Sequence, residues 1–349
     1  KPENTQEKEI KDLELQELDN QKRIIEKTKF DISKMSVEDI AKLNATNIKD
    51  ILVRTSGIVE GANESSTNGR KSISIRGLDS SYSLLLIDGK KVNSTDDYIK
   101  HSDYQYSWVP VEMIERIEII KGPKSSIYGS SAIGGVINII TKKDTRKFYG
   151  EIDLQGGISS AEEGGDEKKI SASIGGKITD SLSLILGANK NDRELTTGPG
   201  TSMYGISTDN ASYIEGLETT NGNLKLNYNI DDTQKISASY IKGKETRELY
   251  DYPEYYKLDR DMYSASYEKK FEDISINLDY SRALSDSRYS GGTSNTYNYT
   301  HKLTDDVLKA ETQISIIKDN YIVLGTELSK ERYERYYPMT GVTKYDFEA

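Results

Sequence analysis

Apolar and polar residues alternate strictly along much of the second half of the chain. The clearest segments are 170–174, 224–228 and 274–278, where Ile, Leu, Ala or Tyr alternates with Ser, Lys or Asn. A period of two residues is typical of a β-strand with one apolar and one polar face. Further segments bring the predicted strands to about nine, at 152–158, 182–188, 236–241, 263–267, 308–316 and 322–328. The alternation therefore predicts an antiparallel sheet over most of residues 147–349.

The connections between these predicted strands also alternate, in length. The short ones are 179–181, 231–235, 268–273 and 317–321, and the long ones are 159–169, 189–223, 242–262 and 281–307. All the short connections then fall at one end of the sheet. A soluble β-sandwich also alternates in polarity. The regular up-and-down order, the unequal turns and the polar second face favour a transmembrane β-barrel, because lipid contacts one face and water or protein the other.

A glycine-rich stretch at 114–142 precedes this region. Two β-rich runs, 114–120 and 136–141, flank Gly122, Pro123 and Gly129, so the backbone has to turn between them. We expect a strand, a turn, a short helix, a turn and a second strand.

The residues before that stretch predict a small mixed domain. Ser36 and Asn47 are suited to cap two short helices, and Gly57 to end the second. Two strands follow at 72–76 and 84–88, and Asp88-Gly89 is typical of a tight hairpin turn. With long polar loops at 60–71 and 93–107, residues 31–146 predict an α+β domain whose loops carry function.

Residues 1–30 are densely charged and predict a solvated, partly helical tail. Within this tail, Leu13, Glu14 and Leu15 are able to extend as a strand that pairs with the sheet edge of a partner.

Composition excludes several classes of function. The formal net charge is −10, and the cations are interspersed with carboxylates, which argues against nucleic acid as a partner. The absence of cysteine excludes disulfides and cysteine-ligated zinc. The sequence contains no G-x-S-x-G, P-loop or H-E-x-x-H motif, so we do not expect an enzyme.

Two segments resemble a known family. ISIRGLDSSYSLLLIDGKKV (73–92) and SWVPVEMIERIEIIKGPKSSIYGSSAIGGVINIITKK (107–143) are similar to TonB-dependent outer-membrane receptors, most of all to the catecholate siderophore and colicin I receptor group. The resemblance implies a plug domain at 31–146 inside a barrel of about 22 strands that begins at 147. It also implies a Gram-negative outer membrane surrounding the protein, and active import of a ferric siderophore. The partners would be TonB, membrane lipid and a bacteriocin or phage, and the only iron would be in the transported chelate.

Length suggests that the sequence is the N-terminal portion of such a receptor. Residues 147–349 suffice for about nine or ten strands of the length usual in such barrels. A closed barrel of that size is filled by its own side chains and has no room for the domain. We therefore expect an incomplete barrel with an open edge strand, which should not form a stable membrane protein on its own.

The resemblance also implies roles for individual residues. Arg76 matches a plug arginine that pairs with barrel carboxylates, and Lys121 takes the place of a second lock arginine, without the bidentate fork. The segment at 13–15 is the best candidate for the TonB box. A ferric tris-catecholate is a flat-faced aromatic trianion, so its site should combine cations with rings. The candidate ligand-binding residues are Arg70, Lys71, Tyr98, Lys100, His101, Tyr104, Tyr106, Trp108, Arg247, Tyr252, Tyr255 and Arg260, with Tyr250 and Tyr256 in the same loop.

Other cargoes and classes stay open at this point. Haem receptors usually supply axial histidines, and His101 and His301 are the two histidines of the chain; a histidine in a loop is most often only solvated. A cobalamin or other metal-chelate importer, a passive porin and an adhesin are further alternatives.

Overall fold

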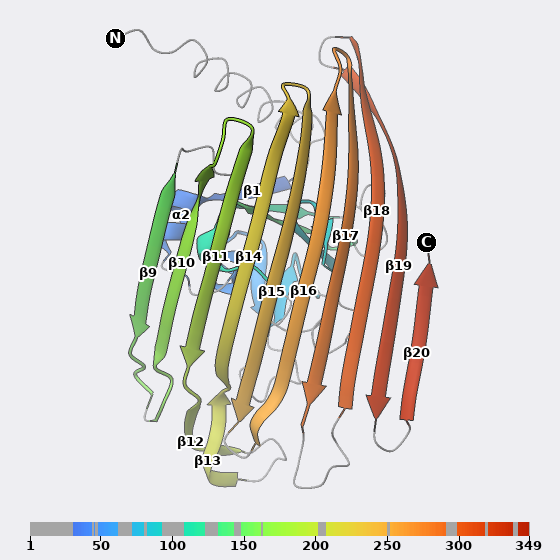
Figure 1. The fold of residues 1–349 in the computed structure, drawn as a ribbon. Helices are drawn as coiled ribbons and strands as arrows, with labels where there is room; N and C mark the ends of the chain where they lie inside the picture. The colour runs from blue at the N-terminus through green and yellow to red at the C-terminus, as the bar shows by residue number, and fades with distance from the viewer. Residues whose placement is uncertain are drawn as a thin grey trace, which may run out of the picture.

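The computed structural model consists of a small α/β plug and a curved wall of ten strands (Figure 1). The structure describes residues 31–43, 45, 48–61, 72–79, 82–92, 108–122, 132–142, 148–161, 163–201, 207–249, 252–290, 299–317, 320–337 and 341–348. The plug, blue to cyan in Figure 1, lies behind the strands of the wall. We call the face of the wall that packs against the plug its inner face.

The plug is built on a five-stranded sheet of order β1-β7-β8-β5-β6 and a three-stranded sheet β2-β3-β4. Its elements are β1 (Asp31–Ser36), α2 (Val37–Lys42), α3 (Ile48–Leu52), β2 (Ile58–Gly61), β3 (Ser72–Ile75), β4 (Leu78–Asp79), β5 (Ser83–Ile87), β6 (Lys90–Lys91), the 3-10 turn η3 (Val111–Met113), β7 (Ile114–Lys121) and β8 (Gly135–Thr141). The strands predicted at 114–120 and 136–141 are confirmed as β7 and β8, which pair antiparallel. β5 pairs parallel to β8. The short helix expected between β7 and β8 lies outside the described residues.

Local signals explain several of the plug's ends and turns. Ser36 Oγ accepts a hydrogen bond from the Asp39 amide, and Asp39 Oδ2 accepts one from the Ser36 amide, so the predicted cap of α2 is confirmed as a reciprocal box. The predicted turn after β5 is also confirmed, with φ values of 49° at Asp88 and 78° at Gly89. The expected helix end at Gly57 is wrong. α3 ends at Leu52, and Gly57, with φ 80°, forms the turn into β2. The capping role of Asn47 lies outside the described residues.

The wall is one antiparallel sheet of order β20-β19-β18-β17-β16-β15-β14-β11-β10-β9. Its strands are β9 (Tyr149–Gly157), β10 (Glu167–Lys177), β11 (Leu182–Arg193), β14 (Gly216–Asp231), β15 (Gln234–Leu249), β16 (Tyr252–Lys270), β17 (Ile274–Tyr289), β18 (Tyr299–Ile317), β19 (Asn320–Tyr337) and β20 (Gly341–Glu348). A small hairpin, β12 (Thr196–Thr201) with β13 (Ser207–Ile214), stands between β11 and β14. The nine predicted strands are all present, and β20 is a tenth that the sequence did not predict.

The predicted long connections are shorter than expected. Most of 242–262 and 281–307 is strand, because β15 to β19 run for 16 to 19 residues. The apolar alternation stops before the hydrogen-bonded ladder does. On β15, for example, the outward positions are Ile236, Ala238 and Tyr240, and the next outward residues are Lys242 and Lys244. The sequence pattern therefore marks the apolar band of each strand and misses its polar continuation.

The wall is apolar on its outside and polar on its inside. Its exposed large side chains include Ile152, Leu154, Leu324 and Leu328. The buried side chains of its inner face are largely polar, and they include Lys169, Ser171, Asn189, Asn221, Lys225 and Ser281. Such an arrangement is typical of a sheet with lipid on one side.

A line of tyrosines and charges bounds the apolar band. Tyr240 stacks on Tyr263 with ring centroids 4.8 Å apart, and directly beyond this pair Lys242 Nζ lies 3.0 Å from Asp261 Oδ1. Aromatic rings followed by charges mark the membrane surface in outer-membrane barrels. Among the described residues, no helix is long and apolar enough to span a bilayer.

Candidate functional site

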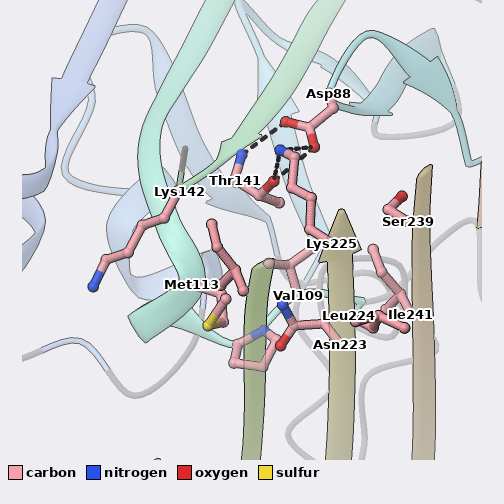
Figure 2. Close-up of a pocket in the computed structure, with 12 residues that line it drawn as sticks. Asp88, Val109, Met113, Thr141, Lys142, Asn223, Leu224, Lys225, Ser239 and Ile241 are labelled. Atoms are coloured by element: carbon pink, nitrogen blue, oxygen red, sulfur yellow. Dashed lines mark hydrogen bonds and ion pairs between the residues drawn. The ribbon is translucent and has the colours of Figure 1, made fainter. Parts of the chain in front are cut away.

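The turn between β5 and β6 contacts the wall through a buried ion pair. Lys225 of β14 donates hydrogen bonds from Nζ to Asp88 Oδ2 (2.8 Å) and to Thr141 Oγ1 (2.6 Å). Thr141, at the end of β8, donates from its amide to Asp88 Oδ1 at 2.9 Å and from Oγ1 to Oδ2 at 2.6 Å. Figure 2 shows Lys225 reaching from the wall toward this pair. Below lies a small cavity lined largely by Val109, Met113, Ile185 and Ile241.

Asp88 is held in its charged form by this arrangement. Burial of the carboxyl raises its pKa, but the charge of Lys225 and the hydrogen bonds from Lys225 and Thr141 together lower the pKa below its usual value. Asp88 therefore joins the plug to β14 as a carboxylate over the neutral pH range.

Four further ion pairs join the plug to other strands, and one of them joins Lys142, directly after β8, to Glu151 of β9 at 3.1 Å. Lys169 of β10 lies 2.5 Å from Glu112 of η3, with side chains 1% and 11% exposed. Lys90 lies 3.5 Å from Asp279 of β17, and Lys91 pairs with Glu327 of β19. Charged contacts thus connect the plug to strands well separated across the wall.

A second buried charge cluster lies at the end of the wall that carries the β12–β13 hairpin. Arg247 Nη1 lies 2.5 Å from Glu215 and its Nε 2.6 Å from Glu245, and Arg260 Nη2 lies 3.4 Å from the other oxygen of Glu245. All four side chains are at most 2% exposed. The Arg260 guanidinium lies 5.6 Å from the ring centroid of Trp108, which belongs to the plug. The cluster therefore connects three segments of the wall to the plug.

The structure brings together three of the predicted ligand-binding residues, Trp108, Arg247 and Arg260. It places the two arginines in strands β15 and β16 instead of a loop. Glu215 and Glu245 were not singled out from the sequence. Glu245 and Arg247 are two positions apart in the sequence, so the strand period alone predicts that they lie on one face.

An aromatic cluster lies on the inner face of β17 to β19. Tyr289 stacks on Tyr299 at 4.7 Å, Tyr299 stacks on His301 at 5.0 Å, and Tyr333 and Tyr337 approach the His301 ring edge-on at 5.6 and 6.0 Å. His301 is 5% exposed. Its ring is therefore packed within a strand and not displayed on a loop.

The two predicted lock cations lie near one another on the plug. Arg76 has a left-handed backbone, with φ 52°, and its amide donates a hydrogen bond to the Gly57 carbonyl at 2.9 Å. A Cβ on Gly57 would lie 3.6 Å from Lys121 Cδ, and one on Gly122 would lie 3.6 Å from Arg76 Nη1. Arg76 is exposed and Lys121 is buried. Both distances are ordinary van der Waals contacts, so the positive φ values, 80° at Gly57 and 98° at Gly122, and not lack of space, favour glycine at these positions.

The remaining candidates are not described at the level of side chains. Tyr252 and Tyr255 lie in β16. The others are outside the described residues, namely Leu13, Glu14, Leu15, Arg70, Lys71, Tyr98, Lys100, His101, Tyr104, Tyr106 and Tyr250. Among the described residues, no three His, Cys, Asp or Glu side chains gather closely enough to hold a metal ion.

A lipid-facing antiparallel wall with a small α/β domain packed on its polar inner face defines a plugged outer-membrane barrel. Comparison with known proteins agrees with this class. Residues 25–136 match the family model of the TonB-dependent receptor plug domain. These residues are therefore a TonB-dependent receptor plug domain, and the chain has the fold of the plug and part of the barrel of TonB-dependent siderophore receptors, which places it in the outer membrane.

Curated relatives match about the first half of the chain. The iron-regulated outer membrane virulence protein of Vibrio cholerae is 37% identical over 166 residues, 46% of this chain and 25% of that protein. The ferric enterobactin receptor PirA of Pseudomonas aeruginosa is 34% identical over 47% of this chain and 24% of that protein. The ferrienterobactin receptor of Escherichia coli is 34% identical over 45% and 22%. The match thus spans about a quarter of the length of these relatives.

Solved structures match the fold over most of the chain. The ferric enterobactin receptor PfeA of Pseudomonas aeruginosa, in a mutant form, aligns with a TM-score of 0.78 at 21% identity, over 89% of this chain and 50% of that one. The siderophore receptor PirA of Acinetobacter baumannii aligns with a TM-score of 0.74 at 22% identity, over 87% and 48%. The chain corresponds to about half of each solved receptor.

Proposed function

We propose that the protein imports a ferric siderophore of the catecholate type across the outer membrane, with energy supplied through TonB. The observation that carries this proposal is the plug, which fills the polar side of a lipid-facing wall and is attached to it by ion pairs. A plugged barrel does not act as an open pore, so passage needs a change in the plug. The named relatives that bind ferric enterobactin support a catecholate cargo.

The proposed ligand site combines plug loops with the loop end of β14 to β16. Trp108, Arg247 and Arg260 are proposed to lie beneath it; both guanidinium groups are buried and paired with Glu215 or Glu245, so they would contact an aromatic trianion only if these ion pairs opened. The upper part is proposed to include Arg70, Lys71, Tyr98, Lys100, His101, Tyr104, Tyr106, Tyr252 and Tyr255.

The proposed energy input acts on the N-terminal tail. Leu13, Glu14 and Leu15 would extend and pair with an edge strand of TonB. Deleting residues 10–16 from the full-length protein should abolish uptake and leave ligand binding unchanged. Normal uptake after this deletion would rule out the segment as the TonB box.

Arg76 and Lys121 are proposed to act as the lock that retains the plug, by pairing with carboxylates of the barrel. The lysine makes a weaker partner than arginine, since it cannot form two parallel hydrogen bonds to one carboxylate. Lys121→Arg should therefore strengthen retention of the plug, measured as slower proteolysis of the plug in the full-length protein.

Uptake of a radioactive metal label, iron in the siderophores and haem and cobalt in cobalamin, tests the function and the cargo together. Cells that carry the full-length protein are supplied with a ferric catecholate, a ferric hydroxamate, haem or cobalamin, with and without TonB. We expect uptake of the catecholate only, and only with TonB. Uptake without TonB would instead indicate a passive porin, and preference for another chelate would overturn the catecholate assignment. Quenching of Trp108 fluorescence by the same ligands, with Trp108→Phe as the control, separates binding from transport.

Haem import is less well supported by the position of His301. The ring is 5% exposed and is packed against Tyr299, Tyr333 and Tyr337, so axial ligation of haem would require the cluster to open. Haem absorbance that appears with the protein and is lost in His101→Ala would favour haem over a catecholate. A bacteriocin or phage is a further proposed partner, and one solved neighbour is a complex of FpvAI with pyocin S2.

A further inference from the structure

Two acids lie side by side on the inner face of the wall. Asp305 of β18 is directly opposite Glu331 of β19 in the strand register. Directly opposite residues of an antiparallel pair share one face of the sheet, with Cβ atoms about 4.5–5.5 Å apart. Asp305 is 5% exposed, and Oε1 of Glu331 is buried. The two carboxyl groups are therefore close together and largely removed from water.

The side chains around Asp305 are mainly apolar. Leu303 and Val307, its neighbours on the inner face of β18, are buried, and so is Ala283, its register partner on β17. Among the described residues, none forms a hydrogen bond or an ion pair with Asp305, and none donates a hydrogen bond to Glu331 Oε1. A carboxylate that is buried without such partners is unfavourable. The two acids therefore need a further partner.

The charges near Asp305 do not supply that partner. Lys91 of β6 acts on Asp305, but its Nζ is paired with Glu327 of β19. Glu331, Asp306 and Glu327 also act on Asp305, and all three are acids. Asp306 lies on the outward face of its strand, because it is the next residue after an inward one. On the inner face, Lys91 thus faces three acids.

A second acid pair in the same sheet shows what the inner pair lacks. Asp259 of β16 lies directly opposite Asp286 of β17, on the outward face. Arg288 Nε lies 3.3 Å from Asp286 Oδ1, Lys302 Nζ lies 3.7 Å from its Oδ2, and the Asp286 side chain is 27% exposed. Cations and water together allow both of these outward acids to ionise. The inner pair is more deeply buried and has no cation of its own.

We propose that Asp305 and Glu331 form a proton-binding site, in which the two carboxyl groups share one proton at neutral pH. The protonated group is an O–H donor, and the ionised group accepts a short charge-assisted hydrogen bond from it. One proton thus gives both acids a partner and leaves a single negative charge. A calcium ion would need six to eight oxygen ligands, and no three acids or histidines of the described residues gather closely enough to hold a metal ion.

The proton site is coupled to the plug through Lys91. A nearby cation favours the ionised form of a carboxyl group, so Lys91 weakens the binding of the proton. The coupling is reciprocal. A movement of the plug that withdraws Lys91 from the wall therefore makes the two acids hold their proton more tightly. The charge of the inner face at this position depends on the pH and on the position of the β5–β6 turn, whichever ligand is transported.

Infrared difference spectroscopy of the full-length protein tests the site, because the C=O stretch of a protonated carboxyl group is separate from the bands of carboxylates. The variants are Asp305→Asn and Glu331→Gln, and the matched control is Asp259→Asn in the outward acid pair. We expect a protonated band at neutral pH that is lost in both inner variants, since the remaining acid ionises beside Lys91 and accepts a hydrogen bond from the introduced amide. The control should keep the band.

Three results would overturn the proposal. Absence of the band from the native protein, or its persistence in both inner variants, would show that the pair holds no proton. Loss of the band in only one of the two variants would show that the proton belongs to one acid and is not shared. A band that appears only after sodium, potassium and calcium are replaced by a large organic cation would show that the site binds a metal cation instead.

Titration of the same band tests the coupling to the plug. Lys91→Gln should shift the loss of the band to higher pH, because the cation that opposes proton binding is removed. Lys90→Gln is the matched control, since Lys90 lies in the same strand and is paired with Asp279, and it should leave the titration unchanged. An unshifted titration in Lys91→Gln, or equal shifts in both lysine variants, would contradict the coupling.

Folding of the variants is checked by resistance to SDS at room temperature, and spectra are compared among variants that pass. If an inner variant does not fold, the native protein carries the test by itself, and one proton per molecule should be released as the band disappears on alkaline titration. The folded protein then binds one proton more than the unfolded chain, so its stability should fall as the pH rises through this step. Constant stability through the step would contradict the shared proton.

Discussion

The plug and the wall share a two-residue alternation, but the apolar face is buried in the plug and exposed in the wall. In the plug, the apolar side chains of β7, such as Ile117 and Ile119, are 0% exposed and pack into a core. In the wall, Leu324 is 59% exposed and Ile152 is 75% exposed, while Lys225, Asn189 and Asn221 on the inner face are buried. The difference shows that a strand pattern fixes two faces, and that the medium on each side decides which face is the buried one.

The two regions also meet in a characteristic way. Only a few apolar side chains of the inner face, namely Ile185, Ile241, Met262 and Ala283, join the core cluster of the plug. The rest of the described contact is rich in ion pairs. Apolar residues thus stabilise each region by itself, and charges define how the two regions fit together.

The largest effect is expected where the inner face of the wall holds buried charge. Glu245→Ala leaves Arg247 and Arg260 without a shared carboxylate, and breaking a buried ion pair costs about 3–5 kcal/mol. Heat-induced unfolding of the full-length protein, followed by gel mobility in SDS, should shift to clearly lower temperature. Glu248→Ala on the outward face of the same strand is the control and should change little. Equal shifts of the unfolding temperature in the two variants would show that the buried ion pairs of the inner face do not stabilise the wall.

The next prediction compares the apolar side chains of the two regions. Ile119→Ala in the plug core should destabilise the plug by about 2–5 kcal/mol, because a cavity remains in a close-packed core. Leu324→Ala at an outward position of β19 should cost far less, since lipid or detergent fills the space. Protease resistance of the plug and thermal unfolding of the wall measure the two effects. Equal losses would contradict the opposite packing of the two regions.

The third prediction locates the lipid boundary on the outside of the wall. Ala238 and Thr246 both lie on the outward face of β15, on either side of Tyr240 and Lys242. Ala238→Arg should cost about 2–4 kcal/mol if the residue faces the bilayer interior, and Thr246→Arg about 0–1 kcal/mol beyond it. Folding into lipid vesicles as a function of urea gives both values. A similar cost at both positions would show that the apolar band does not end at Tyr240.

Sequence reasoning predicted the strands best where only one face was apolar. The alternation predicts strand 263–267, but it predicts a loop for the continuation through Asp259, Arg260 and Asp261, because charges occupy both faces there. β1 was missed for a similar reason, since DISKMS has few apolar side chains, and only its pairing with β7 makes it a strand.

The sequence predicts a site made of cations and rings, and this stays a prediction. The contact between Trp108 and Arg260 joins residues far apart in the chain and follows only from the fold. The ion pair between Asp88 and Lys225 is not predicted, because the sequence Asp88-Gly89 indicates only the shape of the turn. The two-residue alternation predicts the face of the strand on which Lys225 lies, but nothing in the sequence indicates that this face contacts Asp88 of the plug.

The smallest effect is expected at the start of α2, where Asp39 of the plug is exposed. Hydrogen bonds from the Ser36 side chain and amide hold the pKa of Asp39 below its usual value of 3.8. Because the folded pKa is lowered, this contribution to stability is present above the usual pKa and is lost as the pH falls through the lowered value. Ser36→Ala removes one of the two hydrogen bonds, so the pKa of Asp39 should rise toward 3.8. An NMR titration of the labelled carboxyl in the full-length protein measures the shift, with Asp39→Asn to assign the signal. An unchanged pKa of Asp39 would mean that the hydrogen bond from the Ser36 side chain does not persist in solution.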